Sequence, residues 1–156
     1  MDEIVWCMRK KNGIGTIEPN ANLTQAYIGK AEASLETMRL AKSRDWKISA
    51  AYYSLYFALY AVLMRIGVKC EIHSCTLAFA ERFLAAHFTN ADLALLQDAL
   101  QARVDAQYYV DREIKDATVD QMLREAPRFL AHCKEVALKL DEKEIGTIRK
   151  TISQYR

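Results

Sequence analysis

Apolar residues recur at steps of three and four along most of the chain, which is the spacing of amphipathic helices. The first such stretch opens at Asn22, which with Gln25 resembles a capping box, and continues to about residues 43–45. Its predicted apolar face consists of Leu23, Tyr27, Ala31, Leu35 and Met38. A second, strongly apolar helix is predicted over roughly residues 46–66, and Gly67 is placed to end it.

Three further helices are predicted after Gly67. A short one spans about residues 73–87, and a fourth is capped by Thr89, Asn90 or Asp92. The predicted face of the fourth consists of Leu93, Leu96, Leu100 and Val104. The last helix has the most regular face, typical of a bundle seam: Val119, Met122, Ala126, Phe129, Cys133, Val136 and Leu140. Pro127 lies off this face and predicts a kink.

These elements predict an all-α fold, a single antiparallel up-down helical bundle of four long helices plus one short helix. One domain covers residues 1–156, with a loose leader at 1–20, the bundle core at 22–140 and a C-terminal extension at 141–156. Ile145, Ile148 and Ile152 continue the helical spacing, which predicts an extension that packs on a partner or a frayed tail.

Composition supports a helical domain. With 51% of its 156 residues hydrophobic, the chain can bury a core, while 5 Gly and 2 Pro are too few for the turns of a sandwich or barrel. Residues 48–64 carry no charge and are borderline in length for a membrane span. They contain four tyrosines and two serines, so we interpret them as a buried central helix and expect no membrane association.

Charge and cysteine content bear on partners and compartment. The formal net charge of +2 neither requires nor excludes nucleic acid. The acidic N-terminus has no positively charged region of a secretory signal, so we expect a cytoplasmic protein. In that reducing compartment the four cysteines are expected as free thiols: Cys7, Cys70, Cys75 and Cys133.

The common catalytic and cofactor motifs, a Gly-rich phosphate loop, a nucleophile elbow and HExxH, do not occur, and we expect no cofactor. Cys70, His73 and Cys75 are spaced as C-x2-H-x-C, but no convincing fourth ligand accompanies them, so we predict no metal site. Arg82 and His87 combine a phosphate ligand with an acid–base group, but on one helix they point in different directions, which favours a solvated Arg and a core or rim His.

Two groups of side chains are candidates for binding. Tyr52, Tyr56 and Tyr60 form a stripe on the second helix, typical of a core or subunit interface, and we assign them to the interface of a dimer. Arg103 lies at the edge of the apolar face of the fourth helix. It either pairs with an acid such as Glu36 or Glu81, extends to solvent, or faces a cleft where it holds a phosphate. Gln107, Tyr108 and Tyr109 follow it.

Several segments resemble one known family. They are KAEASL at 30–35, AAYYSLYF at 50–57, Gly67, His73, residues 79–83 and RVDAQY at 103–108. In order, spacing and helical context, this set resembles the HEPN (higher eukaryotes and prokaryotes nucleotide-binding) domain family over about residues 22–140.

The resemblance implies a helical bundle that forms a homodimer, is often encoded beside a minimal nucleotidyltransferase, and in many members acts as a metal-independent ribonuclease toxin. In those members an Arg and a His with four to six residues between them lie at the dimer seam. Here the Arg is Arg103, Tyr108 stands where the His would be, and Val104 replaces the usual polar residue. A phenol with an unperturbed pKa of about 10 is a poor general base at neutral pH.

Three functions follow as hypotheses. The first is a dimeric toxin–antitoxin or nucleotidyltransferase-associated component that binds nucleotide or RNA through Arg103, Gln107 and Tyr108 or Tyr109, with catalysis weak or lost. One of the two tyrosines is also a candidate to receive a nucleotide from the transferase. The second is an active endoribonuclease in which Arg103 steadies the phosphate and Tyr108 or His73 carries the proton. The third is a non-catalytic protein-interaction bundle.

Overall fold

The computed structural model describes residues 2–155, most of which are helical. Seven helices and one two-stranded sheet occur in this range: α1 (Glu3–Arg9), β1 (Gly15–Thr16), α2 (Ala21–Leu40), α3 (Arg44–Ile66), β2 (Val68–Lys69), α4 (His73–Phe83), α5 (Asn90–Tyr108), α6 (Asp116–Lys139) and α7 (Glu142–Ser153). The mostly helical class is confirmed. The predicted number of helices is wrong, because α1 was not predicted and the C-terminal extension forms a separate helix, α7.

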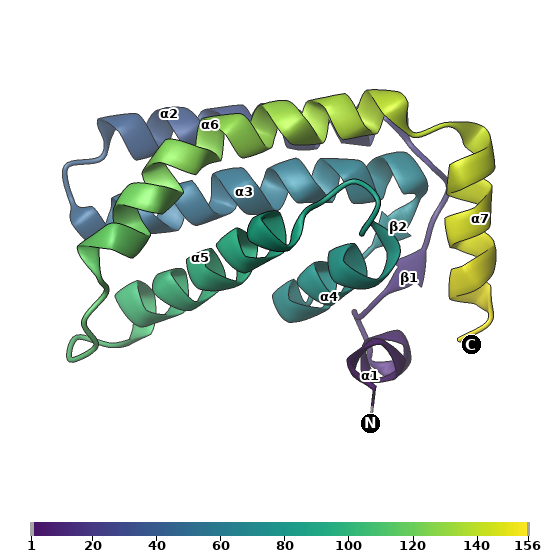
Figure 1. The fold of residues 1–156 in the computed structure, drawn as a ribbon, viewed down its shortest axis with the longest axis horizontal. Coiled ribbons are helices and arrows are strands. Elements are labelled where there is room, and N and C mark those ends of the chain that lie inside the picture. The colour runs from purple at the N-terminus through teal and green to yellow at the C-terminus, as the bar shows by residue number, and fades with distance from the viewer. Residues whose placement is uncertain (1, 156) are drawn as a thin grey trace.

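α3 is the central element of the fold. It contacts α2, α5 and α6, and Figure 1 shows α2 and α6 on one side of it and α4 and α5 on the other. Ile48, Leu55, Leu59 and Leu63 on α3 have no exposed surface. The prediction of a buried central helix over 48–64 is therefore confirmed. Within residues 2–155, no helix has the length and apolar character needed to cross a membrane.

Side-chain caps and one glycine set the helix ends. Asn20, not Asn22, caps α2, because its side chain reaches the amide three residues later at 2.9 Å. Thr89 caps α5 in a reciprocal capping box with Asp92, as one of the predicted alternatives. Gly67 ends α3 with φ of 83°, and a Cβ there would lie 2.5 Å from a backbone carbonyl oxygen, so only glycine fits.

The buried face of α5 differs from the predicted one. Its buried residues are Asp92, Leu95, Leu96, Ala99 and Ala102, whereas Leu93, Leu100 and Val104 are only partly covered. Small alanine side chains let α5 lie close against α3, so the helix turns Ala99 and Ala102 inward and leaves Leu93 and Leu100 toward the rim. α4 also ends earlier than predicted, at Phe83, and His87 lies in the turn that follows.

The N-terminal segment is not a loose leader. Ile4, Cys7 and Ile14 are buried, and β1 pairs antiparallel with β2, Gly15 opposite Lys69 and Thr16 opposite Val68. Cys7 forms a disulfide with Cys75 of α4, so the expectation of four free thiols is wrong for these two. Cys70 and Cys133 are free and buried.

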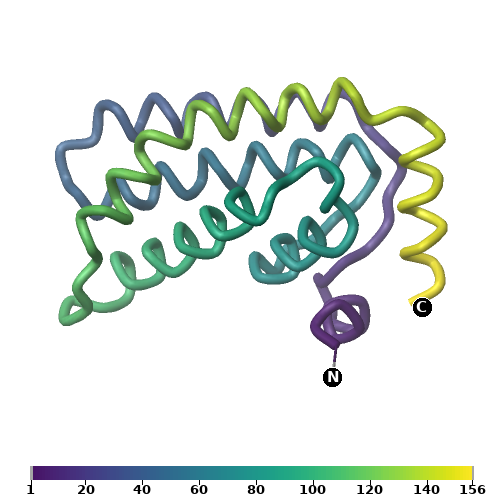
Figure 2. Tube along the Cα trace, in the orientation of Figure 1, coloured from purple at the N-terminus to yellow at the C-terminus, as the bar shows by residue number. Residues whose placement is uncertain are grey.

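The C-terminal extension is helical, as one of the two alternatives predicts, but it packs on its own chain and is not a frayed tail. The isoleucines of α7, Ile145, Ile148 and Ile152, are buried, and Figure 1 shows this helix across the end of the bundle. The Arg149 Nη1 donates hydrogen bonds to the carbonyls of Ile17 at 2.7 Å, Gly67 at 2.8 Å and Ile66 at 3.2 Å. α6 contains Pro127, and Figure 2 shows that this helix changes direction along its length, as the predicted kink requires.

Candidate functional site

Arg103 lies where α5 crosses the middle of α3. Its guanidinium carbon is 5.3 Å from the ring centre of Tyr53 and 5.5 Å from that of Tyr52. Its Nε is buried and has no hydrogen-bond partner among residues 2–155. The expected alternative of an ion pair with Glu36 or Glu81 is not found in this part of the chain.

This arrangement favours an anionic ligand. Aromatic faces attract the guanidinium, but they do not accept its N–H bonds in the way that an oxygen does. A buried donor without an acceptor costs free energy, and an oxygen of a phosphate group would remove that cost. Arg103 is therefore a cation held in place by the tyrosine rings and left with unused donors.

His73, the first residue of α4, lies on the same aromatic face. Its Nδ1 is 2.6 Å from the hydroxyl of Tyr52, and its ring stacks on Tyr56 with the centres 4.2 Å apart. The edge of its ring also meets Tyr53, at 6.2 Å between centres. We call Arg103, His73, Tyr52 and Tyr53 the Arg103–His73 cluster.

The hydrogen bond to Tyr52 fixes the tautomer of His73. Tyr52 has no exposed surface, and His73 is the one hydrogen-bond partner of its hydroxyl among the described residues. A buried hydroxyl proton needs an acceptor, so the phenol donates and Nδ1 accepts. The proton of the neutral imidazole then lies on Nε2, which makes His73 an N–H donor to any ligand.

Electrostatics keep both partners of this bond neutral. Burial raises the pKa of Tyr52 far above its ordinary value. Burial lowers the pKa of His73, and the positive charge of Arg103 lowers it further. At neutral pH the cluster therefore presents one permanent cation and one neutral N–H donor.

The tyrosine stripe belongs to the core of the single chain. Tyr52 is 0% exposed, and Tyr56 and Tyr60 are each 6% exposed. The Tyr56 hydroxyl lies 3.3 Å from that of Thr76, and the Tyr60 hydroxyl accepts a bond from the amide of Cys70 at 3.0 Å. Rings covered in this way leave almost no surface for a second subunit. The assignment of this stripe to a dimer interface is corrected to core.

The other candidates lie at the exposed end of α5. Tyr108 is 67% exposed and, five residues beyond Arg103, points away from it around the helix. The guanidinium of Arg112 lies over the ring of Tyr109, with its carbon 3.6 Å from the ring centre. Arg112 also pairs with Asp105 at 2.9 Å. The structure therefore does not bring Tyr108 and Tyr109 together with Arg103.

Gln107 shares the Arg103 side of α5 and leads to a residue that the sequence patterns did not single out. It lines a pocket of about 250 Å³ together with Trp46, whose side chain is 64% exposed at the start of α3. Asp45, Ser49 and Ala106 also line this pocket. Trp46 stands beside Arg44 and Asp45 in the sequence, and this polar setting was the available signal that its ring is not in the core.

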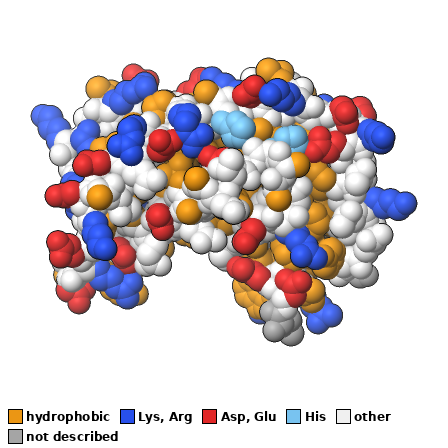
Figure 3. Space-filling view, in the orientation of Figure 1, with side chains coloured by type: hydrophobic (Ala, Val, Ile, Leu, Met, Phe, Trp, Pro, Cys, Tyr) orange, Lys and Arg blue, Asp and Glu red, His pale blue; other side chains and the backbone are white. Residues whose placement is uncertain are grey.

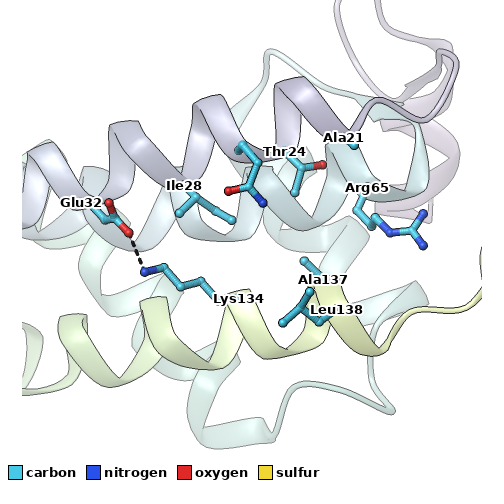
Figure 4. Close-up of a pocket in the computed structure, with 9 residues that line it drawn as sticks. Ala21, Thr24, Ile28, Glu32, Arg65, Lys134, Ala137 and Leu138 are labelled. Carbon is cyan, nitrogen blue, oxygen red and sulfur yellow. Dashed lines mark ion pairs between the residues drawn. The ribbon is translucent and has the colours of Figure 1, made fainter.

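Two other cavities contain none of the predicted binding residues of α5. A groove of about 410 Å³ between α2 and α6 has Ile28 and Ala137 along it and is crossed by the ion pair of Glu32 and Lys134 (Figure 4). A polar pocket near the start of α5 contains two histidines, and its charged groups pair with one another: Arg128 bonds Asp92 and Glu125.

Arg82 and His87 do not form a site. Arg82 donates to the hydroxyl of Tyr155 at 2.9 Å, and His87 pairs with Glu144 of α7. Arg82 is exposed and His87 is partly buried, in agreement with the interpretation of a solvated Arg and a core or rim His. No cluster of three or more potential metal ligands occurs in the described part of the chain.

Charge over the surface is mixed. Figure 3 shows acidic and basic side chains interspersed over the visible face of the described residues, without a broad area of one sign. Long-range attraction of a polyanion is therefore weak, and affinity for one must come from local contacts.

Comparison with known proteins gives one distant similarity. No family model matches the chain. The chain is 28% identical over 116 residues to "Putative toxin MJ0142" of Methanocaldococcus jannaschii, an alignment that covers 71% of this chain and 79% of the relative.

Proposed function

We propose that this chain is a HEPN-type component of a toxin–antitoxin or nucleotidyltransferase-associated pair and binds RNA or a nucleotide through Arg103. The observation that carries the proposal is the buried Nε of Arg103, which has no partner in residues 2–155. The similarity to a protein named as a toxin supports the cellular role. The helical fold and the motifs at 50–57 and 103–108 support the HEPN type.

The chemistry of the cluster favours binding over cleavage. Metal-independent cleavage of RNA needs a base that removes the proton of the ribose 2′-hydroxyl. Nδ1 of His73 already accepts the proton of Tyr52, and Nε2 carries its own, so the imidazole has no free lone pair. Tyr108 is a phenol and lies away from Arg103. Catalysis is therefore weak or lost in this proposal, and the cluster acts as a pair of donors for phosphate oxygens.

In this proposal the chain works as a homodimer with a minimal nucleotidyltransferase as its partner, as in the family it resembles. Because the tyrosine stripe is buried within one chain, the dimer contact lies elsewhere on the surface. Light scattering coupled to size-exclusion chromatography tests the dimer, with a mass of twice 17.8 kDa expected.

RNA binding is tested with a fluorescein-labelled hexaribonucleotide in excess EDTA, followed by anisotropy. Arg103→Ala is expected to weaken binding by tenfold or more, since a charged hydrogen bond contributes about 1.5–3 kcal/mol. Arg103→Lys keeps the charge but loses the planar fork, so it should recover only part of the affinity. Arg124→Ala is the matched control, because this arginine is 70% exposed on α6 and should leave binding unchanged.

A specific observation favours the endoribonuclease as second candidate: His73 lies beside Arg103 on one aromatic face. Incubation of a longer RNA with the protein in excess EDTA separates the two. Cleavage that disappears in both Arg103→Ala and His73→Ala would replace the binding proposal by a catalytic one. Well-folded wild-type protein that neither binds nor cleaves RNA would leave the interaction bundle as the better account.

A further inference from the structure

The pocket at Trp46 is formed by the same two helices, α3 and α5, that carry Tyr52, Tyr53 and Arg103 of the Arg103–His73 cluster. On α3, Trp46, Ser49 and Tyr53 follow at steps of three and four residues, so they share one face. On α5, Gln107 lies four residues beyond Arg103, a rise of about 6 Å. The two faces meet where α3 and α5 pack, so the pocket opens one helical turn from the guanidinium.

The lining of this pocket combines a flat ring with free polar groups. The indole of Trp46 is 64% exposed, and Ala106 adds an apolar methyl group. Asp45 and Gln107 make no side-chain hydrogen bond or ion pair with other residues of the described chain. A carboxylate accepts two hydrogen bonds or more, and an amide both donates and accepts.

This combination matches a nucleobase beside its phosphate. A base stacks on an aromatic ring through its π-face and presents donors and acceptors at its edge. A carboxylate at that edge selects bases with an exocyclic amino group, which adenine and cytosine have and uracil lacks. The guanidinium one turn away is the complementary charge for the phosphate.

We infer that this pocket binds the base of a single-stranded RNA nucleotide whose phosphate contacts Arg103. The base stacks on Trp46, Asp45 accepts from its exocyclic amino group, and Gln107 contacts the remaining edge. The inference rests on the proposed function, because it takes Arg103 as the phosphate ligand. It adds a preference for amino-bearing bases and assigns that preference to Trp46 and Asp45.

The fluorescence of Trp46 gives a direct test. Trp6 and Trp46 are the two tryptophans of the chain, so a Trp6→Phe background leaves Trp46 as the single reporter. Three hexamers serve as ligands: oligoadenylate, oligouridylate and an abasic ribose-phosphate chain of the same charge. Oligoadenylate is expected to quench Trp46 and to bind about tenfold more tightly than oligouridylate. The abasic chain should bind weakly and without quenching.

Substitutions separate the base from the phosphate. Trp46→Ala should weaken oligoadenylate binding about tenfold and leave binding of the abasic chain unchanged, while Trp46→Phe keeps most of the affinity. Asp45→Asn should reduce the preference for adenylate over uridylate. Trp6→Ala is the matched control, because that tryptophan lies on α1. It should leave the affinity for both ligands unchanged. Arg103→Ala should weaken the binding of both oligoadenylate and the abasic chain.

The outcomes distinguish this inference from the proposed function. If RNA binds through Arg103 but Trp46→Ala has no effect, the base pocket is wrong and the proposed function stands. If neither oligoadenylate nor the abasic chain binds the wild type, the proposed function itself fails, and the base pocket with it. If Trp46→Ala changes the oligomeric mass instead of RNA affinity, the pocket is a contact with a second copy of the chain and the inference is overturned.

Discussion

The hydrogen bond between Tyr52 and His73 joins two side chains that would otherwise titrate independently. The phenol loses its proton with difficulty because it is buried, and the imidazole gains one with difficulty because it is half-buried and close to Arg103. The pair therefore remains neutral over a wide pH range. The pair lowers the stability of the folded protein only in acid, where the imidazole must take up a proton inside the fold.

The lowered pKa of His73 predicts how stability changes with pH. In the unfolded chain this histidine titrates near its ordinary value of 6.5, and in the folded protein it titrates lower. Between these two values the unfolded state binds more protons, so the free energy of unfolding falls as the pH falls from about 6.5 through the folded pKa. Urea unfolding of the wild type and of His73→Gln at pH 7.5 and pH 5 checks this.

The variant should lose less stability between the two pH values than the wild type does. Because His87 and His132 are present in both proteins, their titration cancels in the comparison. Equal losses in the two proteins would show that His73 titrates normally when folded.

At the scale of elements, α1 is joined to the bundle both by packing and by a covalent bond. Its buried side chains, Ile4 and Cys7, contact the core, and Cys7 is bonded to Cys75 in the first turn of α4. His73, two residues before Cys75, begins the same turn. The position of a cluster residue therefore depends on an N-terminal helix that the apolar spacing did not predict.

Removal of this disulfide should destabilise the protein. The bond closes a loop with a sequence separation of 68, and loop-closure entropy predicts a loss of about 4 kcal/mol when a bond of this span is broken. Guanidinium unfolding of the oxidised wild type, the reduced wild type and Cys7→Ser/Cys75→Ser measures the loss. The reduced wild type and the double variant should agree, and reductant should leave the double variant unchanged. A midpoint insensitive to reductant in the wild type would contradict the bond.

The sequence predicted the elements whose periodic apolar faces pack locally. α2, α3 and α6 were placed within a few residues, because a continuous apolar face and a cap or glycine define each of them. α1, β1 and α7 were missed or misjudged because their partners are distant in sequence: Cys7 with Cys75, Gly15 with Lys69 and Arg149 with Ile17. No local pattern reports such contacts.

The candidate site, like the fold, was only partly predictable from the sequence. Arg103 was identified because a guanidinium at the edge of an apolar face is expected to have a partner, a path to solvent or a ligand. His73 was named in a rejected metal motif, in the family resemblance and as one alternative source of a proton, but the tertiary fold was needed to place it near Arg103. Trp46 was not identified, since a large aromatic residue at the start of an apolar helix is usually a core residue.

At the scale of the whole molecule, Arg149 holds together three separate parts of the chain. It links α7 to the segment after β1 and to the end of α3, through three backbone carbonyls. The carbonyl of Ile66 is among those that a helix C-terminus leaves without a partner, whereas the carbonyl of Gly67 also accepts from the amide of Ile17 at 2.9 Å. One side chain therefore completes the end of α3 and fixes α7 across the bundle.

Arg149→Ala should destabilise the protein by about 2–3 kcal/mol, because three bonds from one charged donor are lost and the carbonyls of Ile17 and Ile66 lose their partner. Lys150→Ala is the matched control: this neighbouring cation is exposed and should change stability by less than about 0.5 kcal/mol. Thermal and urea unfolding of both variants check the difference. Equal effects of the two substitutions would mean that the three hydrogen bonds contribute little.

The contacts of Arg149 also bear on how the protein is made. They span 132, 83 and 82 positions of sequence, so the residue that completes the end of α3 is synthesised long after α3 itself. While the chain is still on the ribosome, α2 and α3 can pair, but the carbonyls of Ile17 and Ile66 still lack the guanidinium of Arg149 as their donor. The native arrangement at this end of the bundle is therefore reached only after translation of α7. A nascent chain stalled before residue 149 does not form it.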